Sequence, residues 1–141
     1  MQPDLRDIFG ARILEVLAKR RLRQVARVDR EGSTWADFSN GKLGVELANS
    51  SRDADSTRMF VMEPAHMGVQ KPFTLVVAYI RGDADPVVES LDALAAFFDE
   101  NYPRIERLFS GRDGRDRSGY EEYVRQWHLR RFGLDLGKGQ P

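Results

Sequence analysis

The 141-residue sequence contains no cysteine, no long apolar run and no surplus of either charge. Without cysteine, the chain forms no disulfide, thiolate metal site or cysteine nucleophile, as is typical of proteins in a reducing compartment. No apolar run approaches the roughly 20 residues that a membrane-spanning helix needs. The start, Met1-Gln2-Pro3-Asp4, lacks the basic and then apolar stretches of a signal peptide. We therefore expect a cytoplasmic protein of bacterial type with no membrane association.

Side chains that bind metals or act as nucleophiles are also scarce. Histidine occurs twice, at His66 and His128, without the spacing of a metal site. The glycines do not form a phosphate-binding loop, and the many carboxylates are explained as helix caps and solvated loop residues. We expect no catalytic residue, no metal and no cofactor. A small hydrolase that uses His66 and nearby carboxylates stays open as an alternative.

The composition that is present predicts one globular domain. Hydrophobic residues make up 41% and charged residues 31% of the chain, and no linker-like stretch divides it. We expect a single α+β domain over residues 1–141, with 138–141 as a disordered tail. Residues 31–103 hold twelve acidic against five basic residues, and both flanks are basic. Because a nucleic-acid footprint needs a basic surplus collected on one face, nucleic acid is an unlikely partner.

The most informative local signal is Asn40-Gly41, which predicts a two-residue hairpin turn. Such a turn would place Ser39 opposite Lys42. The remaining pairs would be Phe38 with Leu43, Ala36 with Val45 and Thr34 with Leu47, all on the side that faces the core. The opposite side would carry Trp35, Asp37, Gly44 and Glu46.

Periodicity and end signals predict the other elements. Helical spacing indicates an N-terminal helix over 4–19, and Gly133 is expected to end the last helix, which begins at Ser118 with Glu121 in capping-box spacing. Asp85 and Pro86 predict the start of another helix, which restarts near Tyr102-Pro103. Strands are expected over 23–29, 57–63 and 73–80, with the last as the centre of the sheet. The fold class is α+β: an antiparallel sheet of four to five strands with an N-terminal helix and two to three C-terminal helices.

The hairpin side opposite the core is the candidate partner-binding surface. Tryptophan beside polar groups is a common binding hot spot, and Asp37 and Glu46 would attract a basic partner. The nearby loop residues Asp53, Asp55 and His66 complete the candidate set. An equally open alternative is that a helix covers this side and Trp35 belongs to a second core. An exposed sheet edge would also allow self-association.

The layout of the chain loosely resembles that of small immunity proteins of bacterial toxin systems. The resemblance covers residues 5–132 and consists of Trp35 and Phe38 before an Asn-Gly turn, then Leu43-Gly44-Val45-Glu46-Leu47, an apolar strand and C-terminal helices. It implies a cysteine-poor, non-catalytic protein that blocks a basic toxin domain with an acidic face. A second resemblance covers residues 72–101 alone and consists of Pro72-Phe73-Thr74-Leu75 through Tyr79, then Leu91, Leu94, Phe97-Phe98 and Asn101. These residues resemble part of a tail-end or cap protein of phage-like contractile particles, which implies a structural subunit. The leading hypothesis is therefore a protein-binding module of the immunity type.

Overall fold

A computed structural model describes residues 3–50, 57–110 and 114–133 of the chain. Asp53 and Asp55 lie outside the described residues, as does the tail expected at 138–141. Within the described residues, no helix is both long enough and apolar enough to cross a bilayer.

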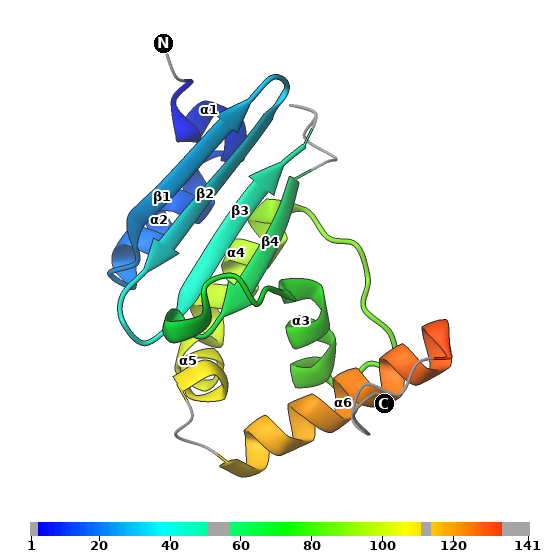
Figure 1. The fold of residues 1–141 in the computed structure, drawn as a ribbon. Coiled ribbons are helices and arrows are strands. Elements are labelled where there is room, and N and C mark those ends of the chain that lie inside the picture. The colour runs from blue at the N-terminus through cyan, green and yellow to red at the C-terminus, as the bar shows by residue number, and fades with distance from the viewer. Residues whose placement is uncertain (1–2, 51–56, 111–113, 134–141) are drawn as a thin grey trace.

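The fold is α+β and is built on one five-stranded antiparallel sheet (Figure 1). The strands lie side by side in chain order: β1 (Arg23–Arg30), β2 (Ser33–Ser39), β3 (Gly44–Asn49), β4 (Thr57–Met62) and β5 (Lys71–Pro72). A tight turn at Glu31-Gly32, with Gly32 at φ 76°, joins β1 to β2. Because successive strands are neighbours, β1 and the very short β5 form the two edges of the sheet.

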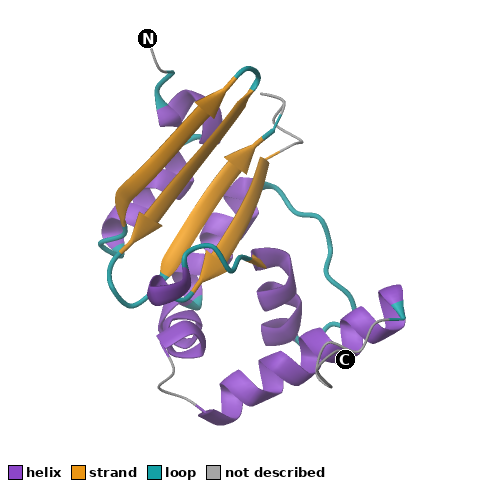
Figure 2. Cartoon of the chain, in the orientation of Figure 1, coloured by secondary structure: helices purple, strands orange, loops and turns teal. Residues whose placement is uncertain are grey.

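The helices α1, α2 and α4 lie behind the sheet in the view of Figures 1 and 2, and α5 lies below its lower end. Gly10, at φ 90° and ψ 157°, divides the expected N-terminal helix into α1 and α2 because no helix continues through that conformation. At the other end of the chain, α6 runs past the end of α3. The bounds are α1 (Leu5–Phe9), α2 (Ala11–Lys19), the 3₁₀ helix η2 (Pro64–His66), α3 (Phe73–Arg81), α4 (Leu91–Glu100), α5 (Tyr102–Ser110) and α6 (Gly114–Phe132).

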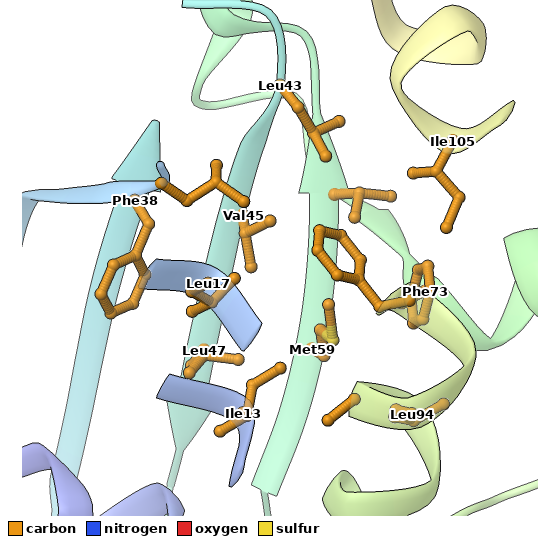
Figure 3. Close-up of a cluster of buried hydrophobic side chains, with 14 of the residues drawn as sticks. Ile13, Leu17, Phe38, Leu43, Val45, Leu47, Met59, Phe73, Leu94 and Ile105 are labelled. Carbon is orange, nitrogen blue, oxygen red and sulfur yellow. The ribbon is translucent and has the colours of Figure 1, made fainter. Parts of the chain in front are cut away.

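The hydrophobic core lies between the sheet and these helices (Figure 3). The side chains of alternate residues of β2, β3 and β4 point into this core, because successive side chains of a strand point to opposite faces of the sheet. The apolar stripes of α2 and α4 pack against those side chains. Buried residues drawn in Figure 3 include Ile13, Leu17, Phe38, Val45, Leu47, Met59, Phe73 and Leu94.

The Asn40-Gly41 turn is longer than predicted. Ser39 pairs with Gly44 rather than with Lys42, so the register differs by two residues. Gly41 has φ 83°, but Asn40 is not among the residues with positive φ, and a type I′ turn needs both. Instead, the Asn40 side chain accepts hydrogen bonds from the amides of Lys42 and Leu43, each at 2.9 Å. A shift of two residues preserves the side-chain parity, so the predicted division of faces is confirmed.

The segment expected as a central strand, 73–80, is the helix α3. It is apolar on several sides because it packs against the sheet edge, α4 and α6. The next helix begins at Leu91, not at Pro86, because Ser90 caps it by accepting a hydrogen bond from the Ala93 amide at 3.1 Å. The last helix starts at Gly114 rather than at Ser118 and ends at Gly133 as expected.

Candidate binding site on the sheet

The sheet face opposite the core carries no α-helix among the described residues, and only the connection that contains η2 lies over its lower end (Figures 1 and 2). Trp35 and Asp37 lie on this face because they alternate along β2 with buried Thr34, Ala36 and Phe38. The strand pairings place further residues on the same face. We call this surface the open face; it consists of Ala26, Val28 and Arg30 on β1, Trp35 and Asp37 on β2, Glu46 and Ala48 on β3, and Arg58 and Phe60 on β4.

Small and apolar residues create a hollow of about 340 Å³ on the β1–β3 part of the open face. Val28 pairs with Trp35 across the strands, and Ala26 pairs with Asp37. Val28 is 47% exposed and Trp35 is half-buried, so apolar surface of both strands meets solvent. Because Ala26 has only a methyl group, the Asp37 side of the hollow is left unfilled.

Two carboxyl groups form the other side of this hollow. Asp37 and Glu46 are directly paired across β2 and β3, and Glu46 is only 8% exposed. Burial, the hydrogen bond with Asp37 and the charge of Asp37 raise the pKa of Glu46 to about 8. At neutral pH the Glu46 carboxyl therefore keeps its proton. The expected acidic strip is correspondingly weaker than two carboxylates.

The connection from β4 to α3 covers one end of the open face. The Gln70 amide donates a hydrogen bond to Glu46 Oε1, which counteracts part of the rise in the Glu46 pKa. Met67 lies directly over Gly44, where a β-carbon would overlap its sulfur atom. Glycine at position 44 thus lets the connection approach the sheet closely. The hollow begins beyond this covered end.

His66 lies apart from the hollow, in the same connection. It lines a second hollow of about 320 Å³ with Glu63, Phe109 and Arg117. His66 Nε2 lies 3.8 Å from Glu63 Oε2, and Arg117 Nη2 lies 2.5 Å from Glu63 Oε1. The structure therefore joins His66 to a carboxylate, but that carboxylate already pairs with an arginine. Among the described residues that line this hollow, none carries a hydroxyl or thiol nucleophile.

The predicted site residues thus separate into groups. The structure brings Trp35, Asp37 and Glu46 together and places His66 in a different hollow. No three histidine or carboxylate side chains of the described residues are arranged to hold a metal ion. Sequence reasoning missed Ala26, Val28 and Phe60, which join the open face through strand pairing. The alternation of Ala26 and Val28 with Arg27 and Asp29 is the signal that would have found the β1 residues.

The outer edge of β1 completes the surface around the hollow. Within the described sheet, β1 has a neighbour on one side only, and Val25 on it is 59% exposed. The pairing with β2 shifts between Gln24 and Ala26, so Val25 forms a bulge. Bulges and basic side chains on an edge strand oppose uncontrolled pairing with other chains.

No protein-family model matches the chain, and no curated protein or solved structure matches it with significant similarity.

Proposed function

We propose that this chain is a non-enzymatic protein-binding module that docks a partner on the open face. The observation that carries the proposal is the hollow beside Trp35, where apolar surface and a carboxyl pair meet on a sheet face without a covering helix. Tryptophan at the centre of such a patch is the type of residue on which binding energy concentrates. The partner class that fits best is a basic toxin domain, which makes the chain an immunity-type inhibitor.

The charge around the hollow supports a basic partner rather than a nucleic acid. Asp37 and Glu46 place two carboxyl groups at the hollow, where they would disfavour phosphates. Acidic groups on one partner and basic groups on the other accelerate encounter and select the orientation of docking. The proposal includes the cytoplasmic, bacterial setting that we expect for the chain.

The test is a binding titration with a basic toxin domain encoded next to this chain. We expect Trp35→Ala to weaken binding at least about 30-fold, the loss typical of a hot-spot residue. Asp37→Lys should weaken it as well, because it puts a cation beside Trp35, where the proposal places a basic group of the partner. Glu100→Lys changes the same charge on α4, on the other side of the sheet, and should leave binding unchanged. Wild-type affinity in both open-face variants, with folding confirmed by circular dichroism, would show that the partner binds elsewhere.

A second candidate function, the small hydrolase, is favoured by the approach of His66 to Glu63. We rank it lower because Glu63 is engaged by Arg117, which also pairs with Glu121 at 2.7 Å. A general base needs a carboxylate or imidazole that is free to accept a proton from its substrate. A catalytic pair here would first have to break the contact between Glu63 and Arg117.

A further inference from the structure

The carboxyl pair of the open face lacks a cation among the described residues. The buried atom Asp37 Oδ1 has no hydrogen-bond partner in the described part of the chain. The hydrogen-bond donor that reaches Glu46 is the neutral amide of Gln70. A buried carboxylate oxygen without a donor is costly, so this position favours a ligand that supplies N–H groups.

The arginines near the hollow do not take this role. Arg27 donates to Asp29 and to the Pro3 carbonyl, at 2.7 and 2.6 Å. Arg58, on β4, donates to the Thr57 carbonyl at 3.0 Å. Arg30 also lines the hollow, but its Cα lies four residues along β1 from that of Ala26, the partner of Asp37. Among the described residues, no ion pair or hydrogen bond joins Arg30 to Asp37 or Glu46.

The dimensions of the site suit a planar cation. Trp35 and Asp37 are alternate residues of one strand, so their Cα atoms lie roughly 7 Å apart on the same face. A guanidinium group fits between an indole ring and a carboxylate, because it stacks on the ring with its face and donates hydrogen bonds from its edge. An ammonium group provides the charge but neither the flat face nor the paired donors.

We propose that the hollow receives an arginine side chain of the protein partner, with its guanidinium between Trp35 and the carboxyls of Asp37 and Glu46. This inference rests on the proposed function and specifies the chemical group that the open face recognises.

Arginine binding should release a proton from the pair. In the absence of a ligand, Glu46 keeps its proton up to about pH 8, because its pKa is raised to about that value. A guanidinium beside both carboxyls favours the doubly ionised form, and the partner arginine itself stays charged throughout. The groups that face Glu46 are the carboxyl of Asp37 on β2, the neutral amide of Gln70 and, farther along the same face, the guanidinium groups of Arg30 and Arg58. Affinity should therefore rise with pH by up to about tenfold per unit between pH 6 and pH 8.

The probe is the tripeptide acetyl-Gly-Arg-Gly-amide, titrated into the ¹⁵N-labelled chain and followed by NMR. The chain has two tryptophans, so the indole N–H signal of Trp35 reports on the hollow while that of Trp127 on α6 is an internal reference. Trp35→Phe assigns the two signals. The matched control peptide carries citrulline, which has nearly the same shape as arginine but no charge.

We expect a saturable shift of the Trp35 signal with the arginine peptide, with a Kd on the order of millimolar, and no shift of Trp127. The citrulline peptide should bind at least about tenfold more weakly. Asp37→Asn should remove the preference for arginine, Glu46→Gln should remove the pH dependence, and Glu100→Gln should change neither. Equal shifts with both peptides would overturn the inference. So would a tighter response of Trp35 to a thymidine oligonucleotide, which would indicate a nucleic-acid surface.

The two proposals fail in different ways. If Trp35→Ala abolishes binding of the toxin domain but the arginine peptide has no effect, the open face binds a partner without an arginine in the hollow. If Trp35→Ala leaves toxin binding intact, the protein-binding proposal itself is wrong.

Discussion

At the scale of single residues, Glu46 shows how a binding surface costs stability. Its carboxyl is buried beside Asp37, and both the burial and this neighbour raise its pKa to about 8 from an ordinary value of 4.5. The folded chain therefore holds a proton that the unfolded chain has released between these two pH values. Each unit of rising pH in that window favours the unfolded chain.

Glu46→Gln should relieve this cost. Glutamine is neutral in the folded and in the unfolded chain, and its side-chain oxygen can still accept the hydrogen bond from Gln70. The variant should therefore have the same free energy of unfolding as wild type near pH 4.5. Its advantage over wild type should grow up to about pH 8. We expect a gain on the order of 1–2 kcal/mol at pH 8, below the full linkage value because the hollow is open to solvent. Thermal unfolding at a series of pH values measures it, with Glu100→Gln as the exposed control. A stability difference independent of pH would contradict the assigned proton.

Asn40 explains why the hairpin was predicted in the correct place but with the wrong turn. Its amide donates to the Arg20 carbonyl at 2.9 Å and to the Tyr102 hydroxyl at 2.7 Å. These contacts join the turn to α2 and α5, which are distant in the sequence. The sequence pattern Asn-Gly reflects only the local backbone preference of these two residues. In the folded chain, hydrogen bonds to distant residues hold Asn40 in a conformation that does not have positive φ. The face assignment was still correct, because a two-residue shift keeps Trp35, Asp37 and Glu46 together.

At the scale of elements, α6 is held against α3 by a polar cluster around Asp116. Its carboxylate accepts hydrogen bonds from Tyr79 of α3 at 2.7 Å and from Arg104 of α5 at 2.9 Å. These donors lower the pKa of Asp116. A β-carbon on Gly119 of α6 would lie only 2.6 Å from the Tyr79 hydroxyl oxygen, which is too close for a non-bonded contact. Glycine at 119 therefore permits the contact between the two helices.

Gly119→Ala should be destabilising in the wild-type chain and stabilising in a Tyr79→Phe background. Alanine favours a helix over glycine by about 1 kcal/mol, but in wild type its methyl displaces the tyrosine hydroxyl from Asp116. Without that hydroxyl, the nearest Tyr79 carbon is at 3.5 Å, an ordinary contact. We expect a loss of about 1–2 kcal/mol in the first background and a gain of up to about 1 kcal/mol in the second, measured by urea unfolding. The same sign in both backgrounds would mean that the hydroxyl does not limit the approach.

The helix α3 was predicted as a strand because apolar residues occupy both alternating sets of positions in the segment. Periodicity does not separate a strand covered on both faces from a buried helix, and Val76 and Val77 favour a strand locally. The end signals were the better guide: Pro72 precedes the segment, and Gly82 follows it at φ 79°. For α4 the end signal misled the prediction. Asp85-Pro86 is a helix-start signal that the chain does not use, and the helix begins at Leu91 instead.

At the scale of the whole molecule, the shape of the sheet bears on self-association. Antiparallel pairing through β1 would place its basic side chains Arg23, Arg27 and Arg30 near those of a second copy, and the bulge at Val25 interrupts a regular ladder. Both features oppose pairing of the β1 edge with itself. A symmetric dimer through the open face with its axis at the carboxyl pair would bring the two copies of that pair together, which is unfavourable.

We therefore expect the chain to be a monomer in solution. Light scattering coupled to size-exclusion chromatography should give one species near 16.1 kDa at concentrations of about 100 μM, at low and at high salt. Rings or larger assemblies would instead favour the structural subunit of a phage-like particle. Val25→Lys is the matched variant: it should leave a monomer unchanged and disrupt an assembly formed through β1.

The order of the strands has a consequence for how the chain folds during synthesis. Every strand pair joins neighbours in the sequence, so the ribbon of β1, β2 and β3 assembles from local contacts as soon as its residues are available. The helix α4, which packs against α2 and β4, begins only at Leu91. Until it arrives, the core face of the ribbon, with Phe38 and Leu47, is only partly covered by α1 and α2. A nascent chain paused before residue 91 would therefore expose two sheet surfaces, of which only the one bearing Trp35 stays accessible in the finished protein.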